Sequence, residues 1–146
     1  MNVGRRVDYA VRALSYLAAQ EPGRVIGSKE ITGKQDIPSH YLSKIMKDLV
    51  AAGLIHSHVG CRGGFSLAGP ADSITLKQVY EAVEKPLILM ECLDKRELYC
   101  RYDSVCTQIS VWERAQSLLA NFLAGISIES IADEGGMRGR FDSLKN

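Results

Sequence analysis

The chain lacks any long hydrophobic run, and this absence argues against a helical membrane protein. No apolar stretch among its 146 residues approaches the roughly 18–20 that a transmembrane helix needs. The two arginines near its start are followed by an amphipathic pattern rather than by the apolar core of an export signal. We therefore expect a cytoplasmic protein with no membrane partner, whose four cysteines are reduced or metal-bound rather than joined in disulfides.

The sequence also lacks the motifs of the common enzyme classes. It contains no phosphate-binding loop of the Walker type, no zinc-hydrolase helix motif and no nucleophile paired with a base. It has no internal repeat, and none of its cysteines forms the Cys-x-x-Cys knuckle that zinc ribbons and fingers use. For these reasons we do not expect an enzyme.

The residues that are present support a packed core and divide the charge unevenly. Apolar residues make up 46% of the chain, which is enough for a folded domain. Residues 1–70 contain nine Lys or Arg against five Asp or Glu, whereas residues 71–146 contain nine against twelve. The resulting net charges, +4 and −3, are typical of an anion-binding module joined to a sensing or dimerising module.

Hydrophobic periodicity predicts three helices in the first third of the chain, over residues 7–20, 29–34 and 38–53. Two short alternating strands are expected at residues 55–59 and 64–68, and a glycine-rich tip joins them. Helix, short helix, turn, helix and two-stranded hairpin is the element order of a winged helix-turn-helix module.

The second half of the chain is expected to contain a fourth helix over residues 75–84 and a longer one over about 106–126. The apolar residues of the longer helix recur three and four positions apart: Trp112, Ala115, Leu119, Phe122 and Ile126. This narrow stripe is the pattern of helices that pair along their length. The same stripe would also suit packing against its own domain, so the pattern alone leaves both alternatives open.

The third predicted helix and the hairpin tip present residues suited to DNA. Ser39 and His40 lie in the first turn of that helix, where recognition helices contact base edges. Lys44 and Lys47 suit phosphates, and Arg62, between glycines at the tip, suits a minor groove. The candidate DNA-binding residues are Ser28, Ser39, His40, Tyr41, Ser43, Lys44, Lys47 and Arg62. Each alone is consistent with an ordinary solvated surface, and it is the ordered set that favours DNA.

Three cysteines, Cys92, Cys100 and Cys106, are separated by seven and five residues in a segment without clear periodicity. Such wide spacing on an irregular loop suits an iron–sulfur cluster better than a single tetrahedral ion. A cluster normally takes four ligands, and Cys61, in the predicted wing, is not expected to be the fourth. The residues alone leave zinc or plain thiols open as alternatives.

Four features of the sequence resemble the family of bacterial winged-helix repressors that includes IscR, NsrR, RirA and CymR. They are the opening helix VDYAVRAL at 7–14, the recognition helix IPSHYLSKI at 37–45, the wing RGGFSLA at 62–68, and the three cysteines followed by Trp112. The ordered combination is specific and extends to about Glu134, although the wing alone would not be.

The resemblance implies a mainly α fold with a small β-wing. Its expected parts are a winged helix-turn-helix domain over 1–85, a cluster-binding loop over 86–106, a dimerisation helix region over 107–134 and a flexible tail over 135–146. Because the family binds a double-stranded DNA operator as a homodimer, the resemblance implies the same partners for this chain.

The resemblance also implies that Cys92, Cys100 and Cys106 hold an iron–sulfur cluster near the dimer interface, [4Fe-4S] rather than [2Fe-2S]. IscR-like members place a histidine three residues after the last cysteine, where this chain has Ile109. The cysteine spacing is closer to that of RirA-like members.

NsrR-like members use an aspartate in the first helix, donated by the partner subunit, as a cluster ligand. Asp8 occupies the matching position, so we expect Asp8 of the partner subunit to be the fourth ligand. The alternative is that Asp8 pairs with Arg12, one helical turn further on.

Together these expectations describe a DNA-binding transcriptional repressor whose operator binding is controlled by a cluster that senses redox state, nitric oxide or iron. One alternative is a thiol- or zinc-based regulator of the same fold, which would be colourless. An alternative from another class is an electron-transfer iron–sulfur protein, for which the basic face of the winged helix would have no purpose.

Overall fold

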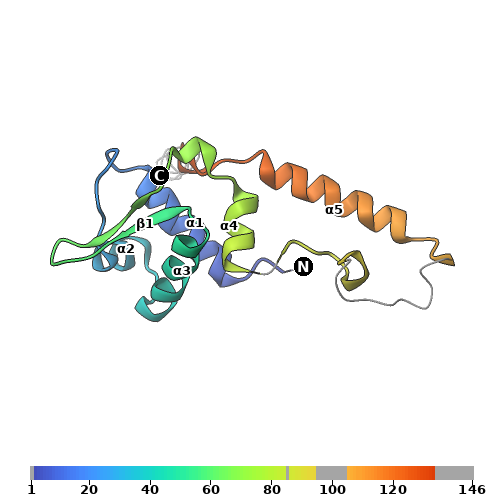
Figure 1. The fold of residues 1–146 in the computed structure, drawn as a ribbon, viewed down its shortest axis with the longest axis horizontal. Helices are drawn as coiled ribbons and strands as arrows, with labels where there is room; N and C mark the ends of the chain where they lie inside the picture. Colours follow the sequence, from blue (N-terminus) through green and yellow to red (C-terminus); the bar gives the residue numbers. More distant parts are fainter. Residues whose placement is uncertain (1, 85, 95–104, 134–146) are drawn as a thin grey trace, which may run out of the picture.

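The computed structural model describes residues 2–84, 86–94 and 105–133 of the chain. Its elements are α1 (Arg5–Ala18), α2 (Ser28–Gln35), α3 (Ser39–Ala51), β1 (Ile55–His58), β2 (Gly64–Leu67), η1 (Ala71–Ser73), α4 (Leu76–Val83), η2 (Glu91–Leu93) and α5 (Ile109–Ala124), with residues 128–133 also helical. The expected fold class, mainly α with a small two-stranded wing, is confirmed (Figure 1). None of the helices in these residues has the length and apolar character needed to cross a membrane.

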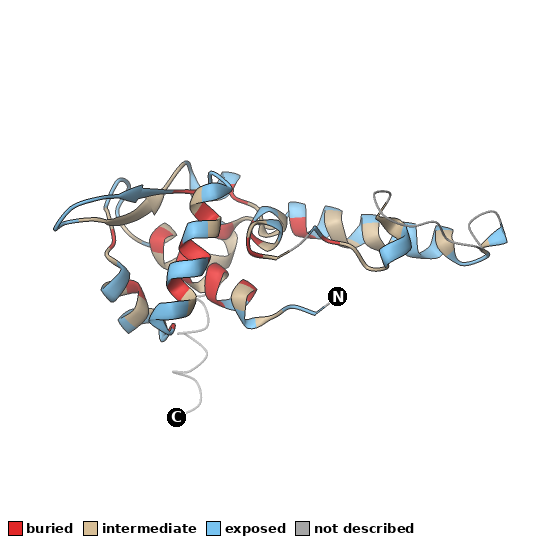
Figure 2. Cartoon of the chain, turned by 60° about the horizontal axis from the view of Figure 1, so that its bottom comes forward, coloured by how far each residue is buried: buried red, intermediate tan, exposed pale blue. Residues whose placement is uncertain are grey.

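The hydrophobic core lies where α1, α3 and α4 meet the base of the wing. Apolar residues spaced three and four apart put Ala10 and Leu14 of α1 and Leu42 and Ile45 of α3 on facing sides, with at most 1% of each exposed. Figure 2 shows the buried residues gathered in this globular part, from which a mostly exposed helix projects. An ion pair between Arg6 and Asp48 further ties α1 to α3.

The turn between α2 and α3 follows from two residues with special backbone preferences. Asp36 adopts the left-handed conformation, with φ 51° and ψ 49°, which aspartate tolerates better than most residues. Pro38 then caps α3 from outside the helix, where its missing N–H costs nothing. Ile37 between them is buried, so the turn is held against the core.

The wing is an antiparallel hairpin in which Ile55 pairs with Leu67 and His58 with Gly64. A third segment joins it, because Ile26 and Phe65 exchange two backbone hydrogen bonds of 2.9 Å. Gly64 is required there: a Cβ atom on it would lie 2.2 Å from the Ile26 carbonyl oxygen.

α5 projects from the globular part, and the chain runs along it from the far tip back to the core (Figure 1). Leu123 is the only buried residue of α5, yet Ile128, four residues after the helix ends, is fully buried in the core. Backbone hydrogen bonds of 2.8 Å from Leu76 to Ile126 and from Ile128 to Ile74 fasten this return. α5 is therefore an arm anchored at its C-terminal end.

Two local expectations need correction. The second helix was expected to begin at residue 29, but α2 already includes Ser28, and its N-cap is Gly27, with no side-chain capping bond. The long helix was expected from about residue 106, but α5 begins at Ile109, so Cys106 lies on the preceding loop.

Candidate functional site

α3 divides sharply into a buried and an exposed face. Leu42, Ile45, Met46 and Leu49 are buried in the core, whereas the expected DNA-binding residues Ser39, His40, Ser43, Lys44 and Lys47 are all exposed. The 3.6-residue period therefore places the polar set together on the side of α3 that faces solvent. With respect to the described residues, neither Lys44 nor Lys47 forms an ion pair, so both ammonium groups are available to an anion.

Tyr41 differs from the other candidates because it is half-buried. Its ring lies edge-on to that of Tyr9, 5.5 Å away, and 4.6 Å from the His40 ring. Tyr41 thus anchors the start of α3 to α1 and limits where His40 can point. Ser28, at the start of α2, and Arg62, at the tip of the wing, are both exposed.

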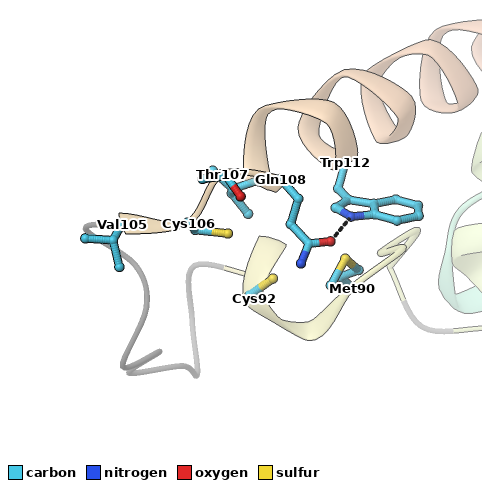
Figure 3. A pocket seen from close by; sticks show the side chains of 8 residues that line it. Met90, Cys92, Val105, Cys106, Thr107, Gln108 and Trp112 are labelled. Atoms are coloured by element: carbon cyan, nitrogen blue, oxygen red, sulfur yellow. Dashed lines mark hydrogen bonds between the residues drawn. The ribbon is translucent and has the colours of Figure 1, made fainter.

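A second candidate site lies at the N-terminal end of α5, where two of the predicted ligands meet. Cys92 in η2 and Cys106 just before α5 line one cavity of about 310 Å³, although thirteen residues separate them in the sequence. Figure 3 shows both thiols facing this cavity, with Met90, Gln108 and Trp112 around it. Cys100 lies outside the described residues.

The cavity has room for a thiolate-held cluster. It is about tenfold larger than the roughly 30 Å³ that one water molecule occupies in the liquid. Its free cysteines are the soft donors that iron–sulfur clusters use. In the described part of the chain, no three His, Cys, Asp or Glu side chains converge as a metal site, so a complete ligand set needs residues beyond this part or beyond one chain.

Asp8 is not part of this cavity in the single chain. Its two carboxylate oxygens accept hydrogen bonds from Arg12, 3.2 Å from Nε and 2.7 Å from Nη2. The hydrogen bond with Asp8 raises the pKa of the Arg12 guanidinium. Arg12 also donates through Nη1 to the carbonyl oxygen of Gln35, 2.8 Å away, at the end of α2. The ion pair expected as the alternative is thus present, and it connects α1 to the turn before α3.

Asp8 instead lies at an apolar groove, also of about 310 Å³, between α1, α4 and the return segment. The groove is lined by Val3, Val7, Asp8, Val11, Leu76, Tyr80, Leu123 and Ile131. The sequence gives no direct signal of this groove, because its walls come from three separated segments.

The apolar stripe of α5 is split between two faces. Phe122 of the predicted stripe forms an exposed ridge with Val111 and Leu118, which the predicted stripe did not include. Val111, Leu118 and Phe122 are 63%, 63% and 65% accessible. Trp112 is 39% exposed and lines the cysteine cavity instead. The predicted stripe therefore combined residues that the tertiary structure assigns to different surroundings.

Comparison with known proteins gives the family. The model of the Rrf2 family, described as an iron-dependent transcriptional regulator, matches residues 3–134. A putative HTH-type transcriptional regulator of Aquifex aeolicus is 32% identical over 126 residues, covering 86% of this chain and 87% of that protein. The HTH-type transcriptional regulator NsrR of Oceanobacillus iheyensis is 28% identical over 131 residues, covering 90% and 89%.

Among solved structures, CymR of B. subtilis, titled the global cysteine regulator, has the same fold. Its TM-score is 0.72 at 22% identity, over 92% of this chain and 98% of that chain. The relatives are named as transcriptional regulators and not as enzymes, as the sequence led us to expect. The resemblance seen in the four sequence features is thereby confirmed, and the chain belongs to the Rrf2 family of transcriptional regulators.

Proposed function

We propose that the protein is a cytoplasmic DNA-binding repressor, active as a homodimer, whose operator binding depends on an iron–sulfur cluster. The observation that carries the proposal is that Cys92 and Cys106 line one cavity at the N-terminal end of α5. Two thiols that the chain brings together from separate segments, beside a DNA-binding module, suit a sensor better than an electron carrier.

In this proposal α3 enters the major groove with its exposed face. Ser39 and His40 contact base edges, while Lys44 and Lys47 contact phosphates. Arg62 reaches the adjacent minor groove from the tip of the wing. The exposed Ser28, at the N-terminus of α2, is placed to contact the backbone, because helix N-termini attract phosphate.

Cys92, Cys100 and Cys106 would hold the cluster, [4Fe-4S] rather than [2Fe-2S], which when bound supplies a group sensitive to oxygen, nitric oxide and iron supply. α5 begins at the cavity, and the partial positive charge at the N-terminus of this helix favours anionic thiolates there. Asp8 of the partner subunit would be the remaining ligand.

The shape of the monomer supports this exchange of ligands. In a two-fold dimer, a ridge on each copy can fill a groove on the other. The ridge Val111, Leu118 and Phe122 and the groove between α1 and α4 are both apolar and both open in one chain. Because the groove contains Asp8 and the ridge begins near Cys106, this packing would bring the partner's Asp8 toward the cysteines.

Arg12 would couple the state of the cluster to the position of the DNA-binding helices. An Asp8 carboxylate that ligates iron has less charge to offer Arg12, which keeps its bond to the Gln35 carbonyl at the end of α2. An Asp8 carboxylate that does not ligate iron keeps both of its hydrogen bonds from Arg12. The position of α2, and with it the turn into α3, would differ between the two arrangements.

The likeness to CymR supports a second candidate function, sensing by cysteine thiols without a cluster. That protein is titled a cysteine regulator, and the cavity with Cys92 and Cys106 would also suit sensing by thiols alone. Such a protein would be colourless and contain no acid-labile sulfide, whereas the cluster proposal requires both colour and sulfide.

The decisive experiment is anaerobic purification, with iron and sulfide counted per subunit and operator binding measured before and after oxidation. We expect about four of each per subunit for a [4Fe-4S] cluster, and a changed operator affinity after oxidation. D8A is expected to change the visible spectrum and shorten the lifetime of the cluster. R12A removes the same ion pair but keeps the carboxylate, so its spectrum should match the wild type.

K44A serves as the control for the DNA arm. It should lower operator affinity and reduce the salt slope by about one, with iron content unchanged. Oxygen-protected protein without iron, or equal operator affinity with and without the cluster, would overturn the sensing proposal. An unchanged spectrum in D8A would exclude Asp8 as a ligand.

A further inference from the structure

A hydrogen bond between two residues of the cysteine cavity fixes the direction of an amide group. Nε1 of Trp112 donates to Oε1 of Gln108 at 2.9 Å, and both side chains line the cavity. The indole N–H can only donate, so the amide atom that faces it must be the oxygen. The NH₂ of Gln108 is consequently the group turned away from Trp112.

The surroundings of that NH₂ group are rich in sulfur. Figure 3 shows the amide nitrogen of Gln108 pointing to the side of the cavity where Cys92 and Met90 lie. Apart from the Thr107 hydroxyl, the remaining side-chain heteroatoms of the lining are the sulfurs of these two residues and of Cys106. An amide donor directed at thiolates is the arrangement in which a hydrogen bond stabilises negative charge on sulfur.

We propose that Gln108 donates a hydrogen bond to the thiolate or sulfide ligands held in this cavity, and that Trp112 is the positioning residue that keeps its NH₂ turned inward. This inference rests on the proposed function. Hydrogen bonds to the sulfurs of a cluster favour its more electron-rich state and so raise its reduction potential. Gln108 therefore sets how easily the bound group is oxidised, while the cysteines decide whether it binds.

Three substitutions distinguish the role of Gln108, the hydrogen-bond donor, from that of Trp112, which positions it. Q108L removes the donor at similar length, and Q108E replaces NH₂ by an oxygen that repels thiolates. W112F keeps an aromatic side chain, although a smaller one, and removes the indole N–H donor, which frees the amide to rotate. Q116L is the control, because Gln116 lies within α5, beyond the N-cap residue Gln108, and accepts from the Leu89 backbone N–H at 2.9 Å, yet does not line the cavity.

The first measurement is the reduction potential of the reconstituted protein in an anaerobic titration with redox mediators. Q108L should shift the reduction equilibrium about tenfold toward the oxidised form, which is about 59 mV for a one-electron couple. Q108E should shift it further in the same direction, W112F less, and Q116L not at all.

The second measurement is the fluorescence emission of Trp112, which needs no cluster. The emission reports on this one site, because Trp112 is the only tryptophan of the chain. In the protein without iron, Q108L should shift the fluorescence emission of Trp112 to shorter wavelength, because the indole loses its acceptor, whereas Q116L should not. Iron-loaded wild type with an unchanged potential in Q108L would overturn this inference alone. Wild type that binds no iron would overturn the proposed function and this inference with it.

Discussion

Single side chains connect α1 to the helix-turn-helix through groups that lie far apart in the sequence. Arg12 reaches the end of α2 through the Gln35 carbonyl. The Tyr16 hydroxyl donates to Glu30 of α2 at 2.6 Å, and Arg24 reaches the same carboxylate at 3.1 Å. α2 is therefore held at both of its ends by polar side chains, although Ile31 is its only buried residue.

The carboxylate of Glu30 makes this connection dependent on pH. The hydrogen bond from Tyr16, followed by the charge of Arg24, lowers the pKa of Glu30 below its ordinary value of 4.5. A carboxylate whose pKa is lower in the folded state stabilises the fold above its unfolded pKa, and the stabilisation is lost as pH falls through the folded pKa. We expect the difference in melting temperature between wild type and E30Q to be largest near neutral pH and to shrink below about pH 4.

E81Q serves as the control for this pH series, since Glu81 belongs to a longer pair of 3.8 Å with Lys77. Its difference from wild type should stay small throughout, as for most exposed ion pairs. A difference between wild type and E30Q that does not change with pH would contradict the role assigned to the Glu30 carboxylate.

At the scale of elements, the wing depends on two glycines that lie against backbone rather than side-chain atoms, Gly63 against His58 and Gly64 against Ile26. A Cβ atom at Gly64 would meet the carbonyl oxygen of Ile26 at 2.2 Å, and backbone atoms cannot rotate away. We expect G64A to separate the wing from Ile26 and to destabilise the protein by about 1–3 kcal/mol, as overpacking does. Urea unfolding would measure the loss.

Gly33 provides the opposite case for the same substitution. It lies inside α2 with nothing within 4 Å of a Cβ atom, so G33A should stabilise the protein by about 0.4–1 kcal/mol. Equal effects of G64A and G33A on the midpoint of unfolding would contradict the close approach of Gly64 to Ile26.

At the scale of the whole molecule, one chain leaves the apolar ridge of Val111, Leu118 and Phe122 on α5 uncovered. Leu118 and Phe122 expose about two thirds of their surface on a helix whose C-terminal end is fastened to the core. Exposed apolar surface of this kind favours association, because each Å² of it that is removed from water stabilises the complex by about 25 cal/mol. A second copy can cover this ridge with its groove, while its own ridge packs into the groove of the first copy.

We expect L118E to give a folded monomer where the wild type is a dimer, as measured by light scattering after gel filtration. A charge in the centre of the ridge would have to be buried without a partner, which is costly. V59E is the matched control, since Val59 is a fully exposed apolar residue on the wing, away from α5. A dimer that persists in L118E, or is lost in V59E, would place the interface elsewhere.

Much of the fold could be predicted because its signals are local. The periodicity of apolar residues located α1, α3 and α4 to within about two residues, since a helix must turn its apolar stripe inward wherever it packs. The exposed face of α3 followed directly from the same period. The type and spacing of the three cysteines predicted a cluster without excluding zinc or plain thiols, and the cluster stays a prediction.

The tertiary structure alone decided which groups meet across the chain. Arg12 donates to the Gln35 carbonyl, Cys92 and Cys106 line one cavity, Ile26 joins the wing and Ile128 returns to the core. The local pattern left each of these contacts unseen. The reason is physical: periodicity records only that a side chain avoids water, whereas the partner that replaces the water is chosen by how distant segments pack.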